Sequence, residues 1–133
     1  MDWSKVVDAP DFSDCVNKQT IEAKVVSVYD GDTIKVIFPL NGVLYKWNCR
    51  LSGVDTPELR TRNVNEKKYG YVVRDKLREK ILNKVVSLSC GDLDKYGRLL
   101  ISIFLDGENV NQWLIVNDYA FAYDGGKKRS WEE

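Results

Sequence analysis

The chain has 133 residues, of which 44% are apolar and 30% are charged, and its 20 basic and 20 acidic residues give a formal net charge of zero. These numbers are typical of one soluble globular domain. With no histidine and no Cys-x-x-Cys pair, the chain has no imidazole for catalysis, and a zinc site is not expected.

The N-terminus has no basic segment followed by an apolar one, and no run approaches the roughly 20 apolar residues of a membrane span. We therefore expect an intracellular, cytoplasmic protein without a membrane segment, and by default a monomer. The three cysteines are far apart in the sequence, which favours reduced thiols, although one bridged pair stays open.

The first twenty residues carry four aspartates and two lysines, are aperiodic, and are predicted to form a polar arm. Three β-branched or alternating segments follow, separated by Asp-Gly and Asn-Gly turn signals, and they predict a three-stranded meander. These segments are 21–28, 33–38 and 43–54.

The second half of the sequence alternates between helical and extended patterns. After a polar loop at 59–68, apolar residues at helical spacing predict an amphipathic helix over 69–83. The remaining predicted elements are a strand at 85–90, a turn, a fully apolar strand at 98–105 that we expect to be buried on both faces, a short helix at 110–117 and an extended piece at 119–123.

Five short strands with two helices predict an α+β fold built on a small antiparallel β-barrel. The five-stranded barrel of oligonucleotide-binding proteins, the OB-fold, fits this inventory. The predicted domain spans 21–126, and 127–133 form a polar tail.

Two aspartates share the strand positions that face the core. Asp32 has the parity of Ile34 and Val36, and Asp55 has the parity of Cys49 and Leu51. Each comes where its strand begins or ends, and no basic residue of matching parity lies near them in the sequence. Asp-Gly-Asp and Asp-Thr-Pro are also ordinary turn sequences, so these residues could simply form turns. Two inward carboxylates followed by Glu58 nevertheless favour a bound hard cation such as calcium or magnesium.

The basic residues also have two interpretations. Strict alternation points Arg50 outward, away from a site, unless the strand is bulged. Arg98 begins the apolar strand after the turn Asp-Lys-Tyr-Gly, where it is either a surface arginine or a phosphate ligand. From Arg60 to Lys84 there are nine basic residues against three acidic ones, which form either a solvated helix face or a surface for a polyanion.

At these residues the sequence resembles the staphylococcal nuclease (thermonuclease) family. The resemblance spans roughly 21–123 and rests on five segments in family-like order: VYDGDTIKV, RLSGVDTPEL, EKKYG, DKYGR and DGENVNQWL. It implies a five-stranded OB-fold and calcium-dependent cleavage of DNA or RNA that leaves 3′-phosphate and 5′-hydroxyl ends. The segment between Glu58 and Arg98 is shorter than we expect for the type enzyme.

The resemblance also implies a role for each candidate residue. Asp32 and Asp55 are similar to the carboxylate ligands of calcium, and Thr56 to the residue that offers its backbone carbonyl. Glu58 is similar to the carboxylate that positions or deprotonates the attacking water. Arg50 and Arg98 are similar to the pair that grips the scissile phosphate, and the candidate nucleic-acid contacts are Lys95, Tyr96 and Tyr123.

The alternative function is a catalytically weak nucleic-acid-binding or protein-interaction module of the same fold. Nuclease-like repeats of this kind typically lack the acidic and arginine residues, all of which are present here. The sequence therefore favours an active calcium-dependent nuclease.

Overall fold

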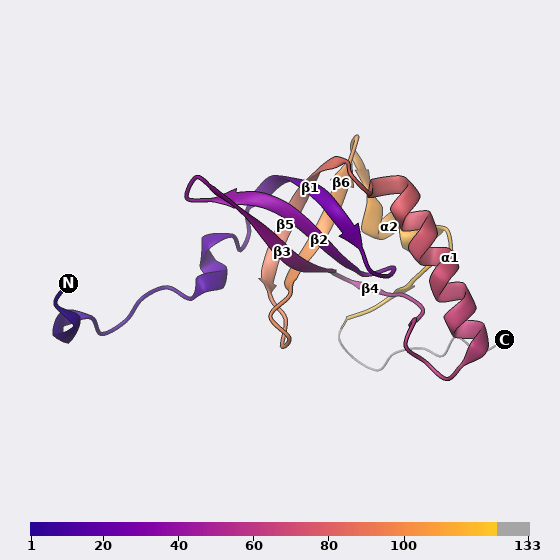
Figure 1. The fold of residues 1–133 in the computed structure, drawn as a ribbon, viewed down its shortest axis with the longest axis horizontal. Helices are drawn as coiled ribbons and strands as arrows, with labels where there is room; N and C mark the ends of the chain where they lie inside the picture. Colours follow the sequence, from indigo (N-terminus) through magenta and orange to yellow (C-terminus); the bar gives the residue numbers. More distant parts are fainter. Residues whose placement is uncertain (125–133) are drawn as a thin grey trace.

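The computed structural model describes residues 1–124 (Figure 1). The predicted polar tail at 127–133 and the predicted domain end at 126 lie outside these residues. No helix within 1–124 is long and apolar enough to cross a membrane.

A closed barrel of five strands forms the centre of the molecule. Its strands are β1 (Thr20–Val28), β2 (Thr33–Leu40), β3 (Val43–Leu51), β5 (Val85–Leu93) and β6 (Leu99–Leu105). They pair in the order β3-β2-β1-β5-β6, and a further pairing of β3 with β6 closes the barrel. This confirms the predicted α+β fold with a five-stranded OB-type barrel.

The expectation that every strand pair is antiparallel is wrong for the pair that closes the barrel. β3 and β6 run parallel through residues 49–51 and 99–101. A parallel pair needs a long crossover connection, and the chain between these strands includes a helix and a strand. The hairpin between β2 and β3 does turn at Asn-Gly, with positive φ at both Asn41 and Gly42.

Three short strands extend the barrel. β4 (Val54–Asp55) is separated from β3 by a turn with Gly53 at φ +75°, so the predicted strand 43–54 is broken in two. β4 pairs with β8 (Phe121–Ala122), and β7 (Glu108–Asn109) pairs with β6. The pairing of β4 with β8 places the end of the described chain beside the segment that carries Asp55.

The long helix α1 (Val64–Ile81) begins five residues before the predicted start at 69. Asn63 caps it, because its side chain accepts a hydrogen bond from the backbone N–H of Glu66 at 3.1 Å. This cap satisfies a free amide of the first turn and makes the polar segment after it helical. The helix buries Val73, Leu77 and Ile81 in the core, and Gly70 against the loop after β4.

The short helix α2 (Val110–Val116) fixes the end of β3 to β6. Its buried residue Asn111 donates to the carbonyls of Ser52 at 2.9 Å and Ile101 at 3.0 Å, and accepts from the backbone N–H of Ile103 at 3.0 Å. A buried amide that satisfies three backbone groups holds these segments in one arrangement.

Strand β6 is not buried on both faces, as its sequence predicts. Leu99, Ile101 and Ile103 are buried, whereas Leu100 is partly exposed and Phe104 is 37% exposed. A strand of a small barrel has one face inside, so even a fully apolar segment alternates in burial.

The N-terminal arm extends away from the barrel up to its second helical turn, which lies beside the barrel with the Phe12 ring centre 6.0 Å from that of Trp47 (Figure 1). It contains two single-turn 3-10 helices, η1 (Trp3–Lys5) and η2 (Phe12–Cys15), and apart from Ser13 its first fifteen residues are exposed. Val16 is the point where the chain enters the core, at 2% exposure. The three cysteines are free, as the sequence favours.

Candidate functional site

The turn between β1 and β2 carries the first acidic cluster. The carboxylate of Asp30 accepts hydrogen bonds from the backbone N–H groups of Asp32 and Thr33, at 3.0 and 2.8 Å. Asp30 and Asp32 are both buried. The sequence analysis missed this role of Asp30. Aspartate side chains commonly accept hydrogen bonds from the backbone amides two and three residues later and so stabilise turns.

Burial and mutual repulsion disfavour the ionised forms of these two carboxyl groups. Burial, and then the charge of Asp32, raise the pKa of Asp30 to about 7. Two adjacent buried carboxyl groups require positive charge nearby if both are to stay ionised.

Gly31 brings this turn against the segment that follows β4. A Cβ on Gly31 would lie 2.8 Å from Thr56 Cβ and 2.7 Å from Val73 Cγ1 of α1, so only glycine fits. Asp55 and Thr56 are each 2% exposed. The three predicted metal ligands, Asp32, Asp55 and Thr56, are thus all buried, and Gly31 brings the turn that carries Asp32 against Thr56.

The donor set at this end consists of two carboxylates and a backbone carbonyl. Within residues 1–124, no three or more Asp, Glu, Cys or His side chains form a group that could hold a metal ion by themselves. All the candidate ligand atoms are oxygens, which suits calcium, and calcium commonly completes its shell with carbonyls and water.

Arg50 does not point away from the site, as strict alternation predicts. Its Nη2 lies 3.5 Å from Asp32 Oδ2, and its guanidinium donates to the carbonyls of Leu51 at 2.7 Å and Val54 at 3.1 Å. The strand ends at Leu51, so the long side chain can curl over its end and reach these carbonyls. Arg50 is not of matching parity, but it nevertheless gives Asp32 a positively charged neighbour.

Arg98 approaches the same turn from the start of β6. Its Nε donates to Asp94 Oδ2 at 2.7 Å, and its Nη1 lies 3.4 Å from Thr33 Oγ1. The hydroxyl of Thr33 in turn donates to Asp32 Oδ1 at 3.2 Å. The two arginines thus meet at Asp32, one directly and one through Thr33.

Asp94 holds Arg98 in place and was also missed in the sequence analysis. Burial alone would raise its pKa, but hydrogen bonds from the backbone amides of Arg98 and Tyr96 and from the Arg98 guanidinium lower it below the usual value. A carboxylate that stays ionised and accepts three hydrogen bonds gives the arginine one fixed orientation.

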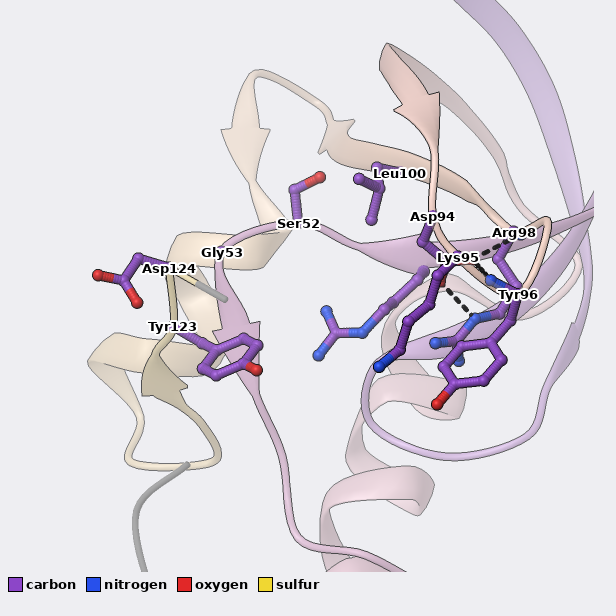
Figure 2. Close-up of a pocket in the computed structure, with 10 residues that line it drawn as sticks. Ser52, Gly53, Asp94, Lys95, Tyr96, Arg98, Leu100, Tyr123 and Asp124 are labelled. Atoms are coloured by element: carbon purple, nitrogen blue, oxygen red, sulfur yellow. Dashed lines mark hydrogen bonds and ion pairs between the residues drawn. The ribbon is translucent and has the colours of Figure 1, made fainter. Parts of the chain in front are cut away.

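A cleft of about 560 Å³ opens beside these arginines, and we call it the barrel cleft. It brings together five of the predicted residues, Arg50, Lys95, Tyr96, Arg98 and Tyr123. Figure 2 shows Tyr123 on one side of the cleft and Lys95 and Tyr96 on the other. Tyr123 owes its position to its backbone N–H, which donates to the carbonyl of Gly53 at 2.9 Å.

Each arginine of the barrel cleft lies near an aromatic ring. The guanidinium carbon of Arg50 is 5.7 Å from the centre of the Tyr123 ring, and that of Arg98 is 5.4 Å from the Tyr96 ring. Cations beside exposed aromatic faces are suited to binding a strand that carries both phosphates and flat bases.

Glu58 does not line the barrel cleft. It is exposed on the loop after β4, and its backbone N–H donates to Glu66 Oε2 at 2.8 Å. Gly70 of α1 allows the same loop to approach, because a Cβ there would lie 3.1 Å from the carbonyl oxygens of Pro57 and Glu58. The helix therefore positions the Glu58 backbone through Glu66 and Gly70, the first and last residues of the segment EKKYG, to which the sequence analysis assigns no role.

Comparison with known proteins agrees with this geometry. A family model described as staphylococcal nuclease homologue matches residues 48–133, well over half of the chain. The chain belongs to the staphylococcal nuclease family. The resemblance predicted from the sequence motifs is confirmed.

Several curated proteins are similar to this family member. It is 37% identical over 100 residues to a thermonuclease of Staphylococcus hyicus, which covers 74% of this chain and 56% of that protein. It is 36% identical over 101 residues to the endonuclease YncB of Bacillus subtilis, covering 74% of this chain and 46% of the relative. An uncharacterized endonuclease of Escherichia coli is 32% identical over 105 residues, covering 78% and 62%. The chain thus spans about half to three fifths of the length of these relatives.

Proposed function

We propose that the protein is a calcium-dependent nuclease that hydrolyses phosphodiester bonds of DNA or RNA and leaves 3′-phosphate and 5′-hydroxyl ends. The observation that carries this proposal is the meeting of two held arginines at a buried aspartate, with Arg50 at 3.5 Å from Asp32 and Arg98 joined to it through Thr33. Relatives named thermonuclease and endonuclease support the same reaction class.

Asp32, Asp55 and the carbonyl of Thr56 would hold the calcium ion. The all-oxygen donor set and the close approach of Gly31 to Thr56 support this assignment. When bound, calcium supplies Lewis-acid polarisation of the phosphate and lowers the cost of charge that develops on it.

The arginines would bind the non-bridging oxygens of the scissile phosphate. Asp94 occupies Nε of Arg98, while its Nη2 has no hydrogen-bond partner within residues 1–124 and can donate to a ligand. Because these guanidinium groups are held before substrate arrives, little reorganisation is needed when negative charge develops in the transition state.

Glu58 would take a proton from the attacking water. The water oxygen forms a bond to phosphorus, the bond from phosphorus to the 5′-oxygen breaks, and the departing oxygen gains a proton from solvent. The Glu58 side chain is exposed, so water can reach its carboxylate, which is the kind of group that acts as a general base.

The test is cleavage of labelled single-stranded DNA and RNA oligonucleotides in calcium, in magnesium and in a chelator, with the product ends identified by mass spectrometry. We expect cleavage in calcium, little in magnesium, which holds its waters tightly and demands octahedral geometry, and none in chelator. Full cleavage in chelator would overturn the metal assignment. Binding without cleavage in calcium would instead support the binding-module alternative.

A further inference from the structure

A second basic cleft, of about 510 Å³, lies between α1, the end of β1 and the loop after Glu58, and we call it the helix cleft. Its lining includes four cationic and two aromatic side chains, Tyr29, Arg60, Lys67, Tyr71, Arg74 and Arg78, and no carboxylate. Those from α1 stand at positions i, i+4, i+7 and i+11, so they share one face of the helix.

Two of these cations contact other residues of the protein, and the other two form no ion pair with described residues. Arg78 Nε donates to the carbonyl of Val28 at 3.1 Å, and the Arg74 guanidinium lies 4.6 Å from the Tyr71 ring while pairing with Asp75 at 3.0 Å. Arg60 and Lys67 form no ion pair with any residue in 1–124. Four like charges around one hollow repel each other, and a bound anion would relieve that repulsion.

The helix cleft begins where the acidic segments of the candidate active site end. Tyr29 directly precedes Asp30, and Arg60 is the second residue after Glu58. The barrel cleft reaches the same β1–β2 turn through Arg50 and Arg98. The turn therefore has a cationic cleft on the side of the barrel strands and another on the side of α1.

We propose that the helix cleft is a second phosphate-binding subsite, which holds a backbone phosphate of the substrate strand beyond the scissile bond. The proposal rests on the nuclease function proposed above. Arginine forks bind phosphate with two parallel hydrogen bonds, and Tyr29 and Tyr71, which are 48% and 40% exposed, offer faces on which an unpaired base can stack. This mixture of cations and aromatic rings favours a nucleic-acid strand over an acidic peptide, which would need no stacking surface.

The subsite can be tested with the double variant Arg60→Ala/Lys67→Ala and the matched control Lys76→Ala/Lys84→Ala. The control removes the same charge from exposed positions outside the cleft. Thermal melting checks that both fold, and the single variant Lys67→Ala replaces the double variant if the latter melts early. The dissociation constant for a labelled single-stranded oligonucleotide is measured by fluorescence anisotropy in chelator, over a series of salt concentrations.

Loss of the contact to this one phosphate should lower the slope of log affinity against log salt by about 0.7, while the control keeps the wild-type slope. Cleavage of a dinucleotide, too short to occupy both clefts, should be equal in the double variant and the control, whereas kcat/KM for the long oligonucleotide should fall roughly tenfold in the double variant.

Equal slopes in the two variants would overturn the subsite, as would an equal loss of cleavage on the dinucleotide and the long substrate. Competition by a short acidic peptide as strong as that of the oligonucleotide would overturn the choice of ligand. If wild type binds but never cleaves, the proposed function fails, and the slopes still decide the subsite.

Discussion

The barrel cleft and the helix cleft both present arginine and tyrosine, but they hold their cations differently. In the barrel cleft, Arg50 and Arg98 project from strands and are fixed by Asp32, Asp94 and backbone carbonyls. In the helix cleft, the cations come from a helix face and a loop, and two of them make no ion pair with described residues. Fixed donors at the scissile phosphate act on the transition state, whereas charges that contact a more distant phosphate act mainly on affinity. The same residue types should therefore affect rate in one cleft and salt-dependent binding in the other.

The largest effect is expected at Glu58, which precedes the loop residues that line the helix cleft. Glu58→Gln keeps the shape of the side chain but removes the proton acceptor, so the single-turnover rate should fall by on the order of 10²–10⁴ while calcium and substrate still bind. Glu79→Gln, on an exposed position of α1, is the control and should keep its rate. If calorimetry shows weakened calcium binding and high calcium restores the rate, Glu58 is a ligand instead of a base.

The second largest effect is expected from replacing the planar guanidinium of Arg98 in the barrel cleft. Arg98→Lys keeps the charge, but its single nitrogen cannot hold Asp94 and donate to phosphate from two separate positions as the guanidinium does, so kcat should fall by on the order of 10²–10³. Arg74→Lys in the helix cleft should change kcat by less than about threefold, because the phosphate proposed to bind there lies away from the scissile bond and contributes to affinity. If the Arg98→Lys variant keeps more than about a third of the wild-type turnover, the fork is not required.

Tyr96 should determine the preference for unpaired substrate. It is 72% exposed in the barrel cleft, and stacking of a base on an aromatic ring contributes about 1–3 kcal/mol. Wild type should cleave single strands faster than matched duplexes, and Tyr96→Ala should reduce that ratio, while Tyr45→Ala, outside this cleft, should not. Initial rates on the two substrates measure the effect, and a wild-type preference for intact duplex would contradict it.

The smallest expected effect is on stability, at the turn that separates the clefts. Gly31→Ala forces a methyl group within 3 Å of Thr56 and Val73, so the turn or α1 must shift at a cost of about 1–3 kcal/mol in the free energy of unfolding. Gly91→Ala is a matched control, because its Cβ would meet its nearest neighbour at 3.4 Å. Denaturant unfolding of both variants gives the difference, and equal stabilities would mean that the turn is not tightly packed.

The sequence predicts the barrel well because alternation in five strands is set by a closed core. The same alternation predicts the burial of Asp32, but it does not account for Asp55, because the turn at Gly53 ends the register of β3 and both residues of β4 are buried. Alternation fails for Arg50. It gives the direction of the Cβ atom, but it does not give the position of the guanidinium of a long side chain near the end of a strand.

The start of α1 could have been predicted from Asn63 and Glu66, an N-cap followed three residues later by an acid, but the polar composition of this segment masks it. The parallel pairing of β3 with β6 could not be predicted locally, because it depends on the path of the chain through α1 and β5. The helix cleft could not be predicted locally either, because its lining combines Tyr29 and Arg60 with residues of α1 that only the folded chain brings together.

The central claim is that the acidic turn and its two arginines form a calcium-dependent hydrolytic site. A calcium titration of single-turnover cleavage by wild type and Asp32→Asn tests it most directly, because the substitution keeps the shape of a ligand and removes its charge. The account predicts that Asp32→Asn requires more calcium for half-maximal rate and regains much of its rate when calcium is raised. An unchanged calcium requirement in Asp32→Asn, or a wild-type rate that does not depend on calcium, would contradict the account.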